Sequence, residues 1–241
     1  MQPRAATMVI RMKTLLLRPL DTEGQVLRVA ALMLLVLSFP VVVLAMATAS
    51  SLIRLPYELS LLDQRLPILF RAHMMSAGLA LLLVPGAIAY QGSSLHKVVG
   101  RSAAIVVLIG GITALPVALA SDASWPARAG FFTQALVWIG LVLAAVRAIR
   151  AADRTRHMWL MLAVAAVASA ALWLRLASWL AVRSGLPFEM AYALAAWLSW
   201  MLPLAVVGLV AWRRHGAVAR EPQSAATEAP RHDRRMARHS V

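Results

Sequence analysis

The chain has 241 residues, of which 61% are hydrophobic and only 14% charged, and its mean hydropathy of +0.74 is too high for an ordinary soluble domain. It has no cysteine, which excludes disulfides, iron–sulfur clusters, thioether-attached haem and thiolate zinc sites. The net charge of +14 could suit nucleic acid, but most Lys and Arg residues flank apolar stretches, where they set orientation and meet anionic lipid. We therefore expect a membrane protein that does not bind nucleic acid.

Six apolar stretches are each long enough to cross a hydrocarbon core about 30 Å thick as a helix. They are predicted near 29–53, 68–90, 95–121, 128–149, 157–183 and 188–212. The ten acidic residues lie outside these stretches, except Glu189 at the start of the last. Proton relays and cation sites in membranes usually depend on buried carboxylates, so such functions are disfavoured. The predicted fold class is all-α, a polytopic transmembrane helix bundle with six spans.

Basic residues are concentrated on one side of the predicted bundle. The N-terminal segment, the second and fourth connections and the C-terminal tail hold most of the 24 Lys and Arg residues, so the positive-inside rule places both termini in the cytoplasm. We divide the chain into a basic cytoplasmic segment (1–27), a transmembrane domain (28–213) and a basic cytoplasmic tail (214–241). The tail lacks helical periodicity, so we expect it to be disordered. It also lacks aromatic residues for stacking on nucleic-acid bases.

The first span resembles a secretory signal peptide in one respect. A basic leader and an apolar run precede the small residues Ala45, Ala47 and Ala49, which could form a cleavage site. The apolar run is longer than a signal peptide requires, so we expect the span to be retained. The expected location is then the bacterial inner membrane, with multiple passes.

Small residues and tryptophans predict how the helices meet. Residues 163–171 of the fifth span are mostly small, and the third span contains Gly110 and Gly111, so both spans should pack centrally. Three tryptophans lie deep in the membrane, about 15–20 Å into their spans at 1.5 Å per residue. These are Trp138, Trp197 and Trp200. A mid-membrane indole needs a partner for its N–H, so these rings either pack between helices or line a ligand cavity.

Few polar residues within or beside the spans could support a function. His96 and His157 are both expected near the inner face, each at a helix N-terminus, where the dipole keeps the imidazole neutral. Two neutral imidazoles at one depth are what a bis-histidine b-type haem requires. His73 and Arg175 are both expected near the outer face, where they could bind an anionic or quinone-like headgroup.

Several enzyme classes lack support. The chain has no Gly-rich phosphate loop, no Gly-x-Ser-x-Gly elbow and no His-Glu-x-x-His motif, so no NTPase, hydrolase or metalloprotease signature is present. The spans are also too apolar for the polar rings that usually line an ion channel. Whether the chain is an enzyme stays open at this point.

Four stretches together resemble the bacterial membrane family known as domain of unknown function 2306 (DUF2306). They are RAH (71–73) through PGAIAY (85–90), LHKVVGR (95–101), RHMWLM (156–161) followed by LRL (174–176), and AYALAAWLSW (191–200). The resemblance covers about 68–212 and implies a multi-helix membrane architecture but no particular reaction. In helix number and histidines, the family looks like small b-type haem cytochromes. The chain departs from the family pattern by lacking a Tyr after Arg101, an Arg around Ala163 and an Asn near Pro203.

Two functions follow as expectations. The first is a non-catalytic bundle that binds a lipid, a quinone or a membrane partner. Its candidate ligand-binding residues, which the resemblance also singles out, are His73, Arg175, Tyr192, Trp197 and Trp200. The alternative is a transmembrane electron carrier that holds b-type haem through His96 and His157.

Overall fold

The structure is a computed structural model that describes the backbone of residues 22–227 and the side chains of residues 24–214. Its helices are α2 (Thr22–Ala49), α3 (Tyr57–Arg65), α4 (Pro67–Ala89), α5 (Leu95–Ala120), α6 (Trp125–Arg150), α7 (Arg154–Ala168), α8 (Ala170–Arg183) and α9 (Phe188–Thr227). Six segments are long and apolar enough to cross a membrane, and α7 and α8 together form one of them. The described chain contains no strand, so the predicted all-α, six-span class is confirmed.

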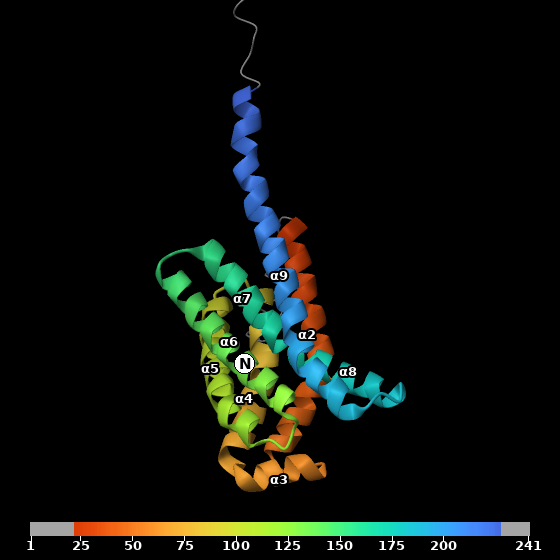
Figure 1. Cartoon of the computed structure of the whole chain (residues 1–241). Helices are drawn as coiled ribbons and strands as arrows, with labels where there is room; N and C mark the ends of the chain where they lie inside the picture. The colour runs from red at the N-terminus through yellow and green to blue at the C-terminus, as the bar shows by residue number, and fades with distance from the viewer. Residues whose placement is uncertain (1–21, 228–241) are drawn as a thin grey trace, which may run out of the picture.

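The spans run in alternating directions, and both ends of the described chain lie at the same end of the bundle (Figure 1). The first span differs most from its predicted position of 29–53. Helix α2 ends at Ala49, because the chain turns there and Ser51 adopts a positive φ of 56°. Hydropathy does not detect such a turn, since residues 52–53 are still apolar.

The fifth span is interrupted at Ser169, between α7 and α8. The Ser169 hydroxyl donates a 2.7 Å hydrogen bond to the carbonyl of Ala166 and accepts one of 3.1 Å from the indole of Trp173. Side-chain bonds of this kind offer the backbone an alternative to the helical pattern and often bend helices. Beyond this point α8 diverges from the bundle, and it contacts α9 far more than α2 or α7 (Figure 1).

The short helix α3 lies across the end of the bundle opposite residue 22 (Figure 1). Two ion pairs attach it. Arg65 contacts Asp122 at 2.7 Å, and Arg71 of α4 donates two hydrogen bonds, of 2.9 and 2.8 Å, to Asp63. These bonds lower the pKa of the Asp63 carboxyl below its ordinary value, so the pair persists in mild acid. We did not predict α3, because its nine residues are too few and too polar for a span.

Small residues lie where helices of the bundle meet. The run Ala163–Ala168 of α7 is buried, and so are Gly110 and Gly111 of α5, so these small residues lie at helix contacts as predicted. Only the α7 half of the fifth span packs centrally, because α8 diverges from the bundle and, among the described helices, α5 contacts only α3, α4 and α6. The approach of α5 to α6 is tight, because a Cβ added at Gly111 would lie 2.6 Å from Cγ1 of Ile139. The same core contains Val84, Val107, Val142, Trp138 and Trp200.

The predicted domain boundaries at 27/28 and 213/214 both fall inside helices. Helix α2 begins at Thr22, and α9 continues past Arg214 to Thr227 (Figure 1). We expected disorder from 214 onward, but the structure is helical over 214–227, where alanine is frequent and favours helix. Residues 1–21 and 228–241 of the two predicted cytoplasmic segments lie outside the described residues.

Candidate functional site

Arg175 is a charged side chain within a membrane-spanning segment. It lies on α8, about eight residues or roughly 12 Å of helix before Arg183. Its guanidinium makes one hydrogen bond to the rest of the described chain, 2.8 Å from Nη1 to the carbonyl of Ala171 one turn earlier. A guanidinium has five N–H donors. Arg175 is exposed at the surface of the bundle, and its hydrogen bond to Ala171 leaves most of its donors without an acceptor among the described residues.

Tyr192 of α9 lies close enough to Arg175 for the two side chains to interact electrostatically. The ring of Tyr192 stacks on Phe188 at 5.4 Å between centroids, with an interplanar angle of 21°. Its centroid also lies 5.5 Å from that of Phe131 of α6, with the two rings in an edge-type arrangement at 64°. We call Arg175, Tyr192, Phe131 and Phe188 the α8–α9 site. The structure thus brings together two of the residues that the sequence singled out.

Two residues of the α8–α9 site were missed by the sequence reasoning. Phe188 lies four residues before Tyr192 in the same helix, a spacing that puts both rings on one face. That spacing could have identified Phe188. Phe131 comes from α6, about sixty residues earlier in the chain, and only the packing of α6 against α9 brings it near Tyr192.

The deep tryptophans all have hydrogen-bond partners for their indole N–H groups, as we expected. Trp138 donates to the carbonyl of Val164 at 3.2 Å, which joins α6 to α7. Trp197 donates to the carbonyl of Pro126 at 3.0 Å, which joins α9 to α6. Trp200 donates at 3.0 Å to Ala196 in its own helix, and its ring lies 6.1 Å from that of Trp197. Because the protein satisfies these donors itself, the bonds favour helix packing over ligand binding.

His73 lies between α4 and α5. Its Nδ1 is 3.0 Å from the carbonyl oxygen of Gly110. Helix α4 makes no contact with α8 in the described chain, so the structure does not bring His73 next to Arg175. A single small headgroup held by both residues therefore has no geometric support here.

The two inner histidines share one arrangement. Nδ1 of His96 lies 2.8 Å from the carbonyl oxygen of Ala87, and Nδ1 of His157 lies 2.9 Å from that of Ala145. A carbonyl oxygen only accepts hydrogen bonds, so Nδ1 of each ring carries a proton and donates it. The other ring nitrogen, Nε2, takes no part in this hydrogen bond. Each histidine thus fastens the start of its helix to the preceding helix, α4 or α6.

The described residues contain no group of three or more His, Asp or Glu side chains that could hold a metal ion. A bis-histidine haem needs only two ligands, so that finding does not bear on His96 and His157. Helices α5 and α7 make no direct contact in the described part of the chain. The two histidines therefore stand on separate helix pairs, α4–α5 and α6–α7.

The family comparison covers the part of the chain that contains these sites. A family model described as "Predicted membrane protein (DUF2306)" matches residues 70–211, from the start of α4 through most of α9. Neither the curated proteins nor the solved structures gave a significant match to the chain.

Proposed function

Because the chain belongs to the DUF2306 family of predicted membrane proteins, a multi-pass architecture is its established property, and we propose that this bundle binds a membrane amphiphile at the α8–α9 site. The ligand is a quinone or a lipid whose headgroup accepts hydrogen bonds. The observation that supports this proposal most strongly is the Arg175 guanidinium, which lies in a membrane-spanning segment with one hydrogen bond, to its own helix.

An arginine within a bilayer is energetically unfavourable, by about 2.5–3.5 kcal/mol at the centre of a span. A headgroup oxygen that accepts from the free N–H groups of Arg175 would offset part of this cost. The Tyr192 hydroxyl supplies a further donor beside it. Charge-assisted hydrogen bonds of this kind are stronger than neutral ones, so the headgroup would be the main source of affinity.

Access to the site also supports an amphiphilic ligand. Helix α8 diverges from the bundle after Ser169 and contacts mainly α9 (Figure 1). Arg175 on this helix is exposed at the surface. The rings of Phe131 and Phe188 add apolar surface on which a quinone ring or an acyl chain can lie. A ligand would enter sideways from the bilayer without crossing the packed interior.

Substitution of Arg175 tests the proposal. We expect Arg175→Leu to weaken binding of a short-chain quinone or of co-purified lipid about tenfold or more, because a hydrogen bond to a charged group contributes about 1.5–3 kcal/mol. Quinone binding is measured by quenching of tryptophan fluorescence in detergent, and lipid binding by native mass spectrometry. Quinone quenching that is weakened by Arg175→Leu would identify the ligand as a quinone. Bound lipid that is lost in Arg175→Leu would identify it as a lipid.

The matched control is Arg183→Leu, the same change on the same helix. Arg183 lies over the ring of Trp179 at 5.5 Å and is not part of the α8–α9 site. The Arg183→Leu protein should bind the quinone or lipid with the same affinity as the unsubstituted protein. Equal affinity of the Arg175→Leu and unsubstituted proteins would overturn the proposal, as would the failure of the unsubstituted protein to bind either ligand.

We propose that the end of the bundle where α5 and α7 begin faces the cytoplasm of a bacterial inner membrane. Basic residues predominate there, among them Lys97, Arg101 and Arg154, whereas Asp63 and Asp122 lie at the other end. A reporter active only in the cytoplasm should therefore work when fused after residue 92 and fail when fused after residue 123. The reverse pattern would show the opposite orientation.

A second function, electron transfer through b-type haem, is favoured by one observation. His96 and His157 both donate from Nδ1 to a carbonyl, the arrangement that orients a histidine to ligate a metal through Nε2. Protein purified with haem supplied should then show a Soret band that is lost in His96→Ala and His157→Ala. A folded protein that stays colourless after haem addition would exclude this function.

A further inference from the structure

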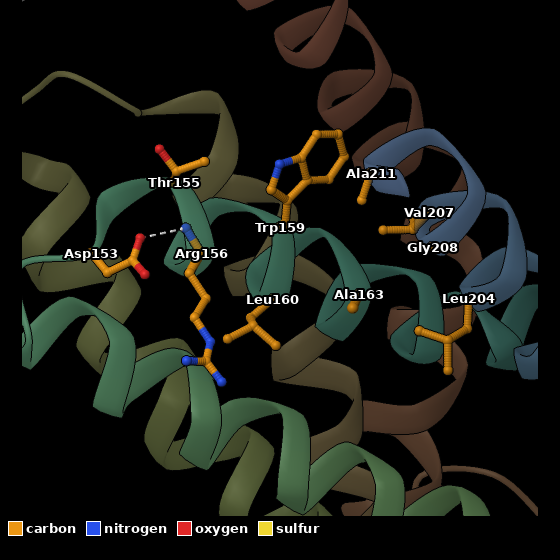
Figure 2. A pocket seen from close by; sticks show the side chains of 10 residues that line it. All are labelled: Asp153, Thr155, Arg156, Trp159, Leu160, Ala163, Leu204, Val207, Gly208 and Ala211. Carbon is orange, nitrogen blue, oxygen red and sulfur yellow. Dashed lines mark hydrogen bonds between the residues drawn. The ribbon is translucent and has the colours of Figure 1, made fainter. Parts of the chain in front are cut away.

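A groove lies between α7 and α9, at the end of the bundle where α7 begins (Figure 2). Its volume is about 560 Å³. Its lining residues are Asp153, Thr155, Arg156, Trp159, Leu160, Ala163, Leu204, Val207, Gly208 and Ala211. The groove is separate from the α8–α9 site, which lies toward the other end of the same span.

The lining divides into a polar part and an apolar part. Asp153, Thr155 and Arg156 lie at the first turn of α7, whereas Leu204, Val207 and Gly208 lie on the facing side of α9 (Figure 2). Such a lining matches an amphiphile that has a polar head and an apolar chain. Trp159 lies between the two parts, the position that an indole takes at a membrane interface.

The charge around the polar part is positive. Residues 147–156 contain four arginines and one acid, Asp153, and residues 208–214 add two arginines and no acid. The Asp153 carboxylate is engaged, because it caps α7 by accepting a 2.9 Å hydrogen bond from the backbone N–H of Arg156. This hydrogen bond leaves the negative charge of Asp153 in place, but the arginines around the polar part outnumber this one acid, so the net charge beside the groove favours an anion.

The apolar part has room along α9. A Cβ added at Gly208 would meet no atom within 4 Å, and the other small lining residues, Ala163 and Ala211, leave the space between the two helices open. Apolar side chains that face such a space gain contacts when a chain of methylene groups fills it. A flexible acyl chain can adapt to this open apolar space better than a rigid ring can.

We propose that this groove binds one anionic glycerophospholipid, with the phosphate beside Arg156 and one acyl chain against Leu160, Val207 and Gly208. The positive charge at the mouth selects anionic over zwitterionic headgroups. The apolar part of the groove holds one acyl chain of this lipid, which would otherwise remain in the bilayer.

Native mass spectrometry of delipidated protein with added phosphatidylglycerol or phosphatidylethanolamine tests the proposal. We expect one phosphatidylglycerol to bind at least fivefold more tightly than phosphatidylethanolamine. Gly208→Leu should lower the amount of bound phosphatidylglycerol at least fivefold, because the leucine side chain occupies the apolar part of the groove. Arg156→Gln should reduce the preference for phosphatidylglycerol.

Matched controls exist for both variants. Gly140→Leu also places a side chain at an exposed glycine with no atom within 4 Å of an added Cβ, but on α6. Arg154→Gln removes a neighbouring charge that does not line the groove. Both should bind phosphatidylglycerol as the unsubstituted protein does. Equal binding of the two lipids, or unchanged binding by Gly208→Leu, would overturn the proposal.

Discussion

Replacement of Gly130 by alanine is expected to destabilise the bundle by about 1–3 kcal/mol, the usual cost of overpacking a close contact. Gly130 of α6 faces α9, where an added Cβ would lie 3.0 Å from the carbonyl oxygen of Ala196 and 3.1 Å from the indole nitrogen of Trp197. The first of these atoms belongs to the backbone and cannot rotate away. The helices must therefore separate, which strains the hydrogen bond from Trp197 to Pro126.

Thermal unfolding in detergent, followed by tryptophan fluorescence, measures this effect. Gly140→Ala is the matched control, because it is the same change on the same helix and an added Cβ there meets no atom within 4 Å. We expect a clear fall in Tm for Gly130→Ala and none for Gly140→Ala. If the two variants melt together, α6 and α9 do not approach each other as closely as Gly130 indicates.

Replacement of Trp138 by alanine is expected to have the largest effect on stability, about 3–5 kcal/mol, as for other buried aromatic side chains. Trp138 is 7% exposed and packs in the core of the bundle. Its removal leaves a cavity between α6 and α7 and breaks the hydrogen bond to the carbonyl of Val164. Trp138→Phe keeps most of the packing and loses mainly that bond, so its cost should be about 1 kcal/mol.

Unfolding of both variants can be compared with that of Trp125→Ala. Trp125 is 70% exposed at the start of α6, so its loss should change stability little. The expected order of stability is Trp125→Ala, then Trp138→Phe, then Trp138→Ala. If the Trp138→Ala protein is as stable as the Trp125→Ala protein, Trp138 does not pack in a closed core. It would then line a ligand cavity, which is the alternative to helix packing that the sequence left open.

Part of the candidate site could be predicted from sequence because charge in an apolar span is conspicuous. Arg175 was identified in this way, and so was the need of Trp138 for a hydrogen-bond partner. The neighbours of Arg175 could not be predicted in the same way. Phe131 reaches Tyr192 only through the packing of α6 on α9, while His73 faces Gly110 of α5 instead of Arg175. Residue depth along a span predicts the level in the membrane but not the direction in which a side chain points.

The amino-acid sequence by itself determined the fold class and the number of spans. Hydrocarbon thickness sets the length of an apolar stretch, and the backbone must satisfy its own hydrogen bonds inside lipid, so six such stretches mean six helical crossings. These constraints act on each segment separately. Only the tertiary structure decided the rest: the interruption at Ser169, the placement of α3 and the groove between α7 and α9. Each of these depends on contacts between residues distant in the chain or on a single side-chain hydrogen bond, and hydropathy records neither.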